Sequence, residues 1–244
     1  MIPDLKTLYT AIDATWPAHT CTDTGAWIIR KGQGGGKRVS AATAMSAKSV
    51  DEIPGAERAM RALGQSPLFM IQQGQDVLDQ TLAAMGYEVL DLSNIYACPI
   101  GRLTQTLPPR TATFHLWEPM AIQLDIWAAG GIGPARIDVM KRAKGPKTAL
   151  FGRDDNRPAA TGFVAIHDGI AMVHALEVLP RHRRRGLARH MMTQAALWAS
   201  ANGATHMSVI CTDANRGANA LYSSLGMTLM GQYHYRHLRK DAPA

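Results

Sequence analysis

A run of basic residues that ends in glycine is the part of the sequence best suited to bind a charged ligand. Residues 181–186 read "RHRRRG"; they follow the apolar stretch "VHALEV" and precede a segment with helical periodicity. A run of this kind can form a loose basic surface for nucleic acid. It can also form a phosphate-binding loop, in which backbone N–H groups at the start of a helix meet an anion.

Three features of the run favour the phosphate-binding loop. The strand–loop–helix setting places free N–H groups and the positive end of the helix dipole at residues 186–189. Gly186 and Ala188 remove side-chain bulk where a phosphate must approach the backbone. No aromatic residue interrupts Arg181–Arg185, although stacking on single-stranded bases requires aromatic side chains. We therefore interpret the run as an anion-binding loop.

The elements expected around this loop form an α/β unit in the second half of the chain. The helix at 186–202 has the clearest pattern, because Leu187, Met191, Ala195 and Trp198 recur at helical intervals and Gly203 follows. Further helices are expected at 118–130, 133–144 and 215–226, and strands at 111–117, at three places within 147–180, at 205–212 and at 227–238.

The first half of the chain predicts a second, smaller set of the same elements. We expect helices at 4–16, 55–64 and 74–86, a strand–turn–strand at 25–44, and strands at 67–72 and 87–100. The glycine-rich "GQGGGKR" is interpreted as a turn and not as a nucleotide-binding loop, because Arg38 stands where that loop needs a magnesium-binding hydroxyl. The prolines of "TLPPR", residues 106–110, predict a linker between domains at 1–105 and 106–244.

An internal repeat relates the two halves. The strand–helix–strand segment from residue 68 to residue 90 lines up with a later one at a fixed offset of 140 residues. In this alignment Gly86 falls under Gly226 and Leu82 under Tyr222. Few residues are identical, so the alternatives are a structural duplication and a chance similarity of two strand–helix–strand units; we interpret the match as a duplication.

Composition limits the classes of protein that the chain can belong to. Of its 244 residues 46% are hydrophobic and 18% are charged, which is typical of a globular protein, and the net charge of +7 favours an anionic ligand. Cys21, Cys98 and Cys211 are too widely spaced to indicate a disulfide framework or a zinc site. No membrane-spanning run or basic-then-apolar signal pattern is present, so we expect a cytoplasmic protein. From the cysteine spacing we also expect no metal.

Two motifs give the chain a family resemblance. Residues 183–188, "RRRGLA", resemble the Arg/Gln-x-x-Gly-x-Gly/Ala signature of the GNAT (Gcn5-related) N-acetyltransferases, and "NRGANALYSSLGM" from Asn215 resembles their second signature. The resemblance implies a mixed-sheet α/β fold, with residues 106–244 as a catalytic domain. The first half resembles the same fold without its signature, since Ser46 falls where Gly186 is expected. The chain therefore resembles two GNAT folds in tandem, with a degenerate N-terminal domain at 1–105.

The resemblance implies acetyl-CoA as co-substrate and assigns residues to it. Val178 would pair its backbone with the pantetheine arm, and Arg183, Arg184 and Arg185 would add positive charge. Asn215 would hold the cofactor or, as the alternative, only cap the following helix. The backbone N–H groups that would bind the pyrophosphate are those of Gly186, Leu187, Ala188 and Arg189.

The resemblance also implies direct attack of a primary amine on the thioester in a ternary complex. Tyr222 stands where the family places the phenol that serves the departing thiolate. His174 matches the position of a proton-relaying histidine in serotonin N-acetyltransferase, and strand alternation predicts that it shares a face with Leu176 and Val178. Glu177, on the opposite face, is also close enough to act as base. His174, Glu177 and an ordered water stay open as the base.

Other functions stay open at this point. An acyl-CoA sensor would keep the binding loop without the chemistry, and a nucleic-acid-binding module would use Arg181–Arg185. The basic and aromatic "QYHYRHLRK", residues 232–240, is interpreted as the end of the last strand and not as an RNA-binding segment. The expected acceptor is a small-molecule or peptide amine, with no membrane partner. The acceptor's identity, the acyl chain and the oligomeric state, a homodimer included, are not determined by the sequence.

Overall fold

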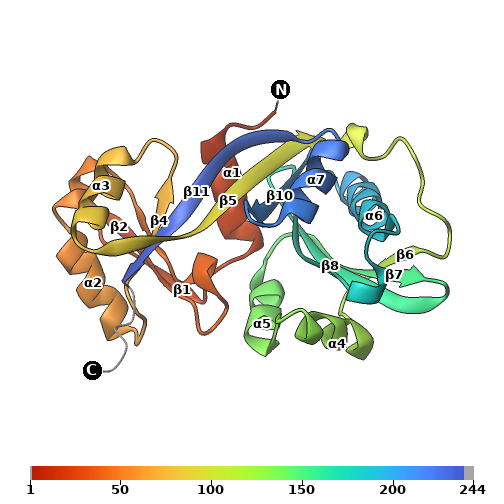
Figure 1. The fold of residues 1–244 in the computed structure, drawn as a ribbon, viewed down its shortest axis with the longest axis horizontal. Coiled ribbons are helices and arrows are strands. Elements are labelled where there is room, and N and C mark those ends of the chain that lie inside the picture. Colours follow the sequence, from red (N-terminus) through yellow and green to blue (C-terminus); the bar gives the residue numbers. More distant parts are fainter. Residues whose placement is uncertain (1, 239–244) are drawn as a thin grey trace. The chain divides into compact units, whose positions relative to one another are not determined.

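A computed structural model describes residues 2–238, which form seven α-helices and eleven β-strands (Figure 1). The chain divides into two compact units. Unit 1 comprises Met1–Pro17, Ile95–Cys211 and Asn215–Met230, and unit 2 comprises Ala18–Asn94, Thr212–Ala214 and Gly231–Ala244. Strands β5 (Tyr87–Pro99) and β11 (Thr228–Leu238) contribute residues to both units.

These units differ from the domains predicted at 1–105 and 106–244. Helix α1 (Leu5–Thr15) belongs to unit 1, because it buries Leu8, Ala11 and Ile12 and its Thr15 hydroxyl lies 2.9 Å from Nε2 of His174. The predicted linker at 106–110 contains no helix or strand, as expected, but it lies inside unit 1. A proline pair therefore marks a loop of this unit and not a domain boundary.

The sheet of unit 1 has the strand order β5-β10-β9-β8-β7-β6. Strands β9 and β10 are parallel, and β9, β8, β7 and β6 pair in antiparallel fashion, so the sheet is mixed. The strands β6 to β10 are Thr113–Leu116, Lys147–Asp154, Arg157–His167, Ile170–Val178 and His206–Thr212. The helices α4 to α7 are Ala121–Ala129, Pro134–Arg142, Leu187–Ala201 and Arg216–Ser224.

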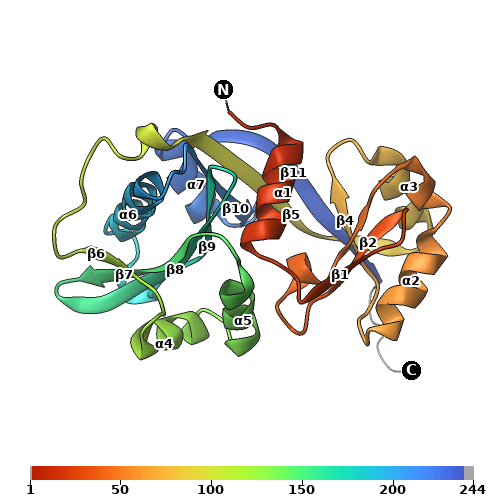
Figure 2. The same cartoon turned by 180° about the vertical axis from the view of Figure 1, so that it is seen from behind.

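Side-chain alternation in β8 shows how helices cover the two faces of this sheet. Val164 belongs to the core that α6 and α7 form with the sheet, a core that includes Met191 and Tyr222. The neighbouring Phe163 points to the other face, where its ring lies 6.2 Å from that of Trp16 at the end of α1. Helices α6 and α7 thus cover one face and α1 the other (Figure 1, Figure 2).

The pairing of β9 with its neighbours is interrupted at the end of the strand. Parallel pairing with β10 runs from Ile170↔His206 to Val173↔Val209. At Ala175, where φ is +51°, the register with β8 shifts, which makes a β-bulge. The Ala175 carbonyl accepts a hydrogen bond of 2.8 Å from the indole N–H of Trp127. Strand β9 therefore separates from β10 over its last residues, and the bulge that accompanies this separation is held by a buried tryptophan.

The strands of unit 2 follow the order β1-β2-β3-β4-β11-β5 in the eleven-stranded sheet. Its core contains Trp27 and Phe69, whose rings lie 5.0 Å apart, and Leu82. Its strands β1 to β4 are Thr20–Asp23, Trp27–Lys31, Ala42–Ala44 and Leu68–Gln72, and its helices α2 and α3 are Ile53–Ala62 and Asp76–Ala84.

Most of the predicted elements are present. All seven predicted helices form, and the predicted strand–turn–strand at 25–44 forms β2 and β3, which pair in antiparallel fashion. Strand β1 was not predicted, because all four of its residues are exposed and show no alternation. Helices α3 and α7 have bounds that coincide at the offset of 140 residues, which agrees with the predicted repeat.

Two further expectations concern the segment at residues 232–240 and membrane-spanning helices. Strand β11 includes residues 232–238 of the basic and aromatic segment, as predicted; residues 239 and 240 lie outside the described residues. Among the helices of residues 2–238, none is both long and apolar enough to cross a membrane.

We expect Trp127→Phe to destabilise the protein by about 1–2 kcal/mol, because it leaves the partly buried Ala175 carbonyl without its donor. The measurement is chemical denaturation followed by circular dichroism. Trp198→Phe is the matched control: Trp198 is also buried in unit 1, but its indole makes no hydrogen bond to a described residue. An equal loss of stability in the two variants would show that the hydrogen bond at the bulge contributes nothing.

Candidate functional site

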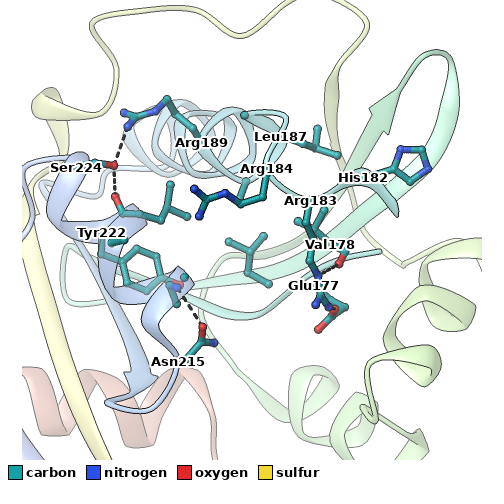
Figure 3. Close-up of a pocket in the computed structure, with 17 residues that line it drawn as sticks. Glu177, Val178, His182, Arg183, Arg184, Leu187, Arg189, Asn215, Tyr222 and Ser224 are labelled. Carbon is teal, nitrogen blue, oxygen red and sulfur yellow. Dashed lines mark hydrogen bonds and ion pairs between the residues drawn. The ribbon is translucent and has the colours of Figure 1, made fainter. Parts of the chain in front are cut away.

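A pocket of about 540 Å³ opens in unit 1 (Figure 3). Its walls are the end of β9, the loop from residue 179 to residue 186, the start of α6 and one side of α7. The lining residues are Leu176, Glu177, Val178, His182, Arg183, Arg184, Gly186, Leu187, Ala188, Arg189, Asn215, Gly217, Ala218, Ala220, Leu221, Tyr222 and Ser224. Most of the residues that the sequence predicted for a ligand site are thus brought together.

The start of α6 supplies backbone donors to this pocket. Gly186 precedes the helix with φ of +83°, a left-handed conformation that glycine adopts without strain. The N–H groups of Leu187 and Ala188 come first in the helix and have no intrahelical acceptor. The N–H of Arg189 differs from the prediction, because it donates to the Gly186 carbonyl at 3.0 Å. Two free amides and the positive end of the helix therefore face the pocket.

The three predicted cationic side chains have different surroundings. Arg183 donates to the Val178 carbonyl (2.8 Å) and to Oε1 of Glu177 (3.0 Å). Arg185 does not line the pocket, contrary to the expectation; it pairs with Asp154 and Asp155, whose hydrogen bond and charges raise the pKa of its guanidinium. Arg184 lines the pocket, with φ of +64°, and has no ion pair within residues 2–238 (Figure 3). Of these three side chains, Arg184 is the one whose charge no carboxylate of the described residues matches; Arg189, which also lines the pocket, donates to the Ser224 hydroxyl at 2.7 Å.

Helix α7 supplies the opposite wall with Tyr222 and Asn215. Tyr222 is buried, and burial first, then the nearby Cys211, raises the pKa of its phenol well above the usual value. The phenol is therefore protonated over the whole neutral range. Asn215 caps α7, because its side-chain oxygen accepts from the Ala218 N–H at 3.1 Å, and it also lines the pocket. The capping predicted as one alternative is therefore present, and the predicted contact of Asn215 with the cofactor stays a prediction.

Glu177 is held in place from two sides. Arg183 pairs with its Oε1, and Gly130, directly after α4, packs against its side chain. A Cβ atom on Gly130 would lie 2.8 Å from the Cγ, Cδ and Oε2 atoms of Glu177, so a side chain at position 130 would displace the Glu177 carboxylate. The Glu177 side chain is 20% exposed and lines the pocket. A carboxylate with this restricted position can accept a proton from a group bound beside it.

His174 is not among the residues that line the pocket. It lies on the opposite face of the sheet, 5.0 Å from the Trp16 ring and stacked on Phe163. The Thr15 hydroxyl donates to the Ala11 carbonyl at 2.6 Å and so accepts from Nε2 of His174. The predicted alternation was wrong here, because the bulge at Ala175 breaks it, and Leu176, Glu177 and Val178 all line the pocket.

Sequence reasoning missed several lining residues. Ala218, Leu221 and Tyr222 share one side of α7 at helical spacing, a pattern that could have identified the first two. His182 was treated as part of the basic run, but it is buried, and its Nδ1 lies 2.6 Å from Asp154. Among residues 2–238, no group of three or more His, Cys, Asp or Glu side chains is arranged to hold a metal ion.

Comparisons with known proteins extend these observations. Residues 117–227 match the model of the acetyltransferase (GNAT) family. The chain is 25% identical, over 242 residues, to a Bacillus subtilis (strain 168) protein described as the uncharacterized N-acetyltransferase YobR, covering 96% of this chain and 98% of that one.

Solved structures give the fold. A GCN5-related N-acetyltransferase from Kribbella flavida matches with a TM-score of 0.72 and 19% identity, covering 96% of this chain and 95% of the other. A tandem GNAT protein from the clavulanic acid biosynthesis pathway matches with a TM-score of 0.61 and 13% identity, over 84% and 76% of the two chains. The predicted fold class, mixed α/β and related to tandem GNAT proteins, is confirmed.

We expect Gly186→Ala to destabilise the protein by about 1–2 kcal/mol, because alanine is strained at this positive φ. Gly203→Ala is the matched control at the other end of α6, since Gly203 has φ of +85° and neither glycine has an atom within 4 Å of a built Cβ. The two variants should lose equal stability in thermal melts, whereas only Gly186→Ala should weaken the binding of pyrophosphate, measured by calorimetry. Equal weakening of pyrophosphate binding in both would contradict the assignment of the anion site.

Proposed function

We propose that this protein, a transferase whose residues 117–227 match the acetyltransferase (GNAT) family, moves an acetyl group from acetyl-CoA to a primary amine by direct attack in a ternary complex. One observation carries the proposal. The pocket has a helix start with two free backbone amides on one side and a buried, protonated phenol on the other, so it offers donors to both ends of a thioester cofactor.

The residues present fit the phosphate end of coenzyme A. The amides of Leu187 and Ala188 and the guanidinium of Arg184 are donors without other partners in the described chain. A pocket of about 540 Å³ lies within the range, roughly 300–1,000 Å³, that small-molecule sites occupy. Arg184 and the helix start would bind the pyrophosphate, and the end of β9, which β10 does not cover, would pair with the pantetheine arm.

Bound acetyl-CoA supplies an acyl group whose C–S bond breaks as the C–N bond to the amine forms. The protein must then accept one proton from the amine and donate one to the departing sulfur. Tyr222 is suited to the donation, because its raised pKa keeps the phenol protonated. Glu177 is suited to accept the amine proton, directly or through a water, and it has a position in the pocket that His174 lacks. Both residues exchange their protons with solvent between turnovers.

The test of the proposal is an assay of thiol release from acetyl-CoA with a panel of primary amines. Turnover above hydrolysis, with the acetylated amine identified by mass spectrometry, is the expected result. Binding of acetyl-CoA without turnover on any amine would indicate an acyl-CoA sensor. Salt-dependent binding of an oligonucleotide, unaffected by saturating CoA, would indicate a nucleic-acid module and refute the proposal.

We expect Tyr222→Phe to lower kcat by about 10²-fold with little change in the KM for acetyl-CoA, because the variant loses a proton donor and keeps the ring. The raised pKa also fixes the sign of the pH dependence. Loss of the phenol proton would lower the activity only above the raised pKa, so Tyr222 adds no fall in kcat between pH 7 and about 9.5. The pH–rate profile of the wild type measures this; unchanged kcat in the variant would remove Tyr222 from the mechanism.

Glu177→Gln and His174→Gln should separate the two candidate bases. Glu177→Gln should lower kcat/KM for the amine by about 10²-fold, because the amide cannot accept the proton. His174→Gln should lower the melting temperature, because it disturbs the contacts with Thr15 and Trp16, and leave kcat/KM per folded molecule nearly unchanged. The opposite pattern of rates would assign the base to His174.

A further inference from the structure

We propose that Asp154, at the tip of the β7–β8 hairpin, is a positioning residue for the cofactor-binding loop. The proposal rests on the proposed function, because it concerns how the pocket holds coenzyme A. Asp154 does not line the pocket and lies about thirty residues before the loop in the sequence. One of its oxygens, Oδ2, contacts both His182 and Arg185, the two residues that flank Arg183 and Arg184.

The hairpin holds this carboxylate in a defined place. Asp154 pairs with Arg157 across the strands, and the two residues between them, Asp155 and Asn156, have φ of +49° and +59°. This is the two-residue turn with positive φ at both central positions, which favours Asn and Asp and fits the twist of paired strands. The Arg153 side chain also donates to the Asn156 carbonyl at 3.1 Å. Asp154 is therefore carried by a rigid element.

The contact with His182 fixes one side of the loop. His182 is buried, and its Nε2 accepts a hydrogen bond of 3.0 Å from Nε of Arg181. An arginine nitrogen can only donate, so the imidazole proton lies on Nδ1, which donates to Asp154 at 2.6 Å. Both ring nitrogens are therefore engaged, and the imidazole is held in one orientation in the pocket wall.

The contact with Arg185 fixes the other side of the loop and separates the charges. Arg185 is occupied by Asp154 and Asp155, and Arg183 by Glu177, so two of the three adjacent arginines are matched by carboxylates of the protein. Arg184, between them, has a strained positive φ that its neighbours must maintain. With both neighbours anchored, the backbone turns Arg184 into the pocket.

The direction in which coenzyme A binding changes when Asp154 is neutralised distinguishes a positioning role from a simple charge effect. Asp154 is an anion beside a loop that would bind an anion. If only its charge mattered, removing it would strengthen the binding of coenzyme A. If Asp154 positions the loop, removing it weakens the binding in spite of the gain in positive charge. The two readings therefore predict opposite changes for the same substitution.

The experiment measures acetyl-CoA kinetics and CoA binding by calorimetry for the wild type, Asp154→Asn, Arg185→Met and the double variant. We expect each single variant to raise the KM and the Kd about 10-fold, with kcat at saturating acetyl-CoA within about 2-fold, because the displaced loop still delivers bound cofactor to Tyr222. The KM and Kd of the double variant should not exceed those of the single variant that binds CoA less tightly, because both substitutions break the contact between Asp154 and Arg185. Asp168→Asn, on the exposed turn between β8 and β9, is the control with the same charge change and should leave KM unchanged.

Each outcome decides the proposal. Tighter CoA binding by Asp154→Asn, or changes in the two single variants that cancel in the double variant, would show a charge effect only and overturn it. A loss of binding in Asp168→Asn equal to that in Asp154→Asn would also overturn it. If Asp154→Asn melts well below the assay temperature, Arg185→Lys, at an exposed side chain, gives a second test. Lysine keeps the charge but loses the fork that contacts both Asp154 and Asp155, so positioning predicts weaker CoA binding and a charge effect predicts no change. A wild type that binds no CoA would overturn the proposed function along with this proposal.

Discussion

The end of the hydrogen-bonded pairing between β9 and β10 is the constraint on which the rest of the site depends. After Val173 and Val209 the strands no longer pair, and at Ala175 strand β9 bulges. A bulge leaves a backbone carbonyl without a strand partner, and burying such a group costs about 1–3 kcal/mol unless a donor meets it. Trp127, on α4, supplies that donor. The separation of the strands is thus stabilised by a helix on another part of the chain, and it leaves residues 176–178 free to line a pocket.

The charges around this pocket are arranged so that most of them are already matched. The chain carries a net charge of +7, and five of the six residues from 181 to 186 are basic or histidine. Yet Arg183 and Arg185 pair with carboxylates, and Arg181 donates to His182. The excess of positive charge along the sequence therefore overstates the charge offered to a ligand, which comes from Arg184, Arg189 and the first amides of α6. In the proposed cofactor site, the binding of an anion would therefore depend mainly on the geometry of the loop.

The sequence was sufficient for the elements whose pattern is local, and not for the features that depend on distant partners. Helix α6 was predicted within one residue at each end, because Gly186 and Gly203 mark both ends with positive φ. Strand β1 was missed because an exposed edge strand has no alternation. The residue type of Ala175 does not indicate a β-bulge, so the sequence could not assign His174 and Glu177 to the correct faces of the sheet. The partners of Arg185 come from a turn thirty residues earlier, and the sequence alone does not pair them.

The assembly of unit 1 from three separate stretches has a consequence for how the protein forms during synthesis. Helix α1 is made about 150 residues before the surface it covers, around Phe163 and His174. Helix α7, which carries Tyr222, is made later still. Contacts between such distant segments lose much chain entropy before they become favourable, so they slow folding. The unit that holds the pocket can therefore complete its core only after α7 has been made, and until then the apolar side of α1 lacks the sheet surface that it covers in the folded protein.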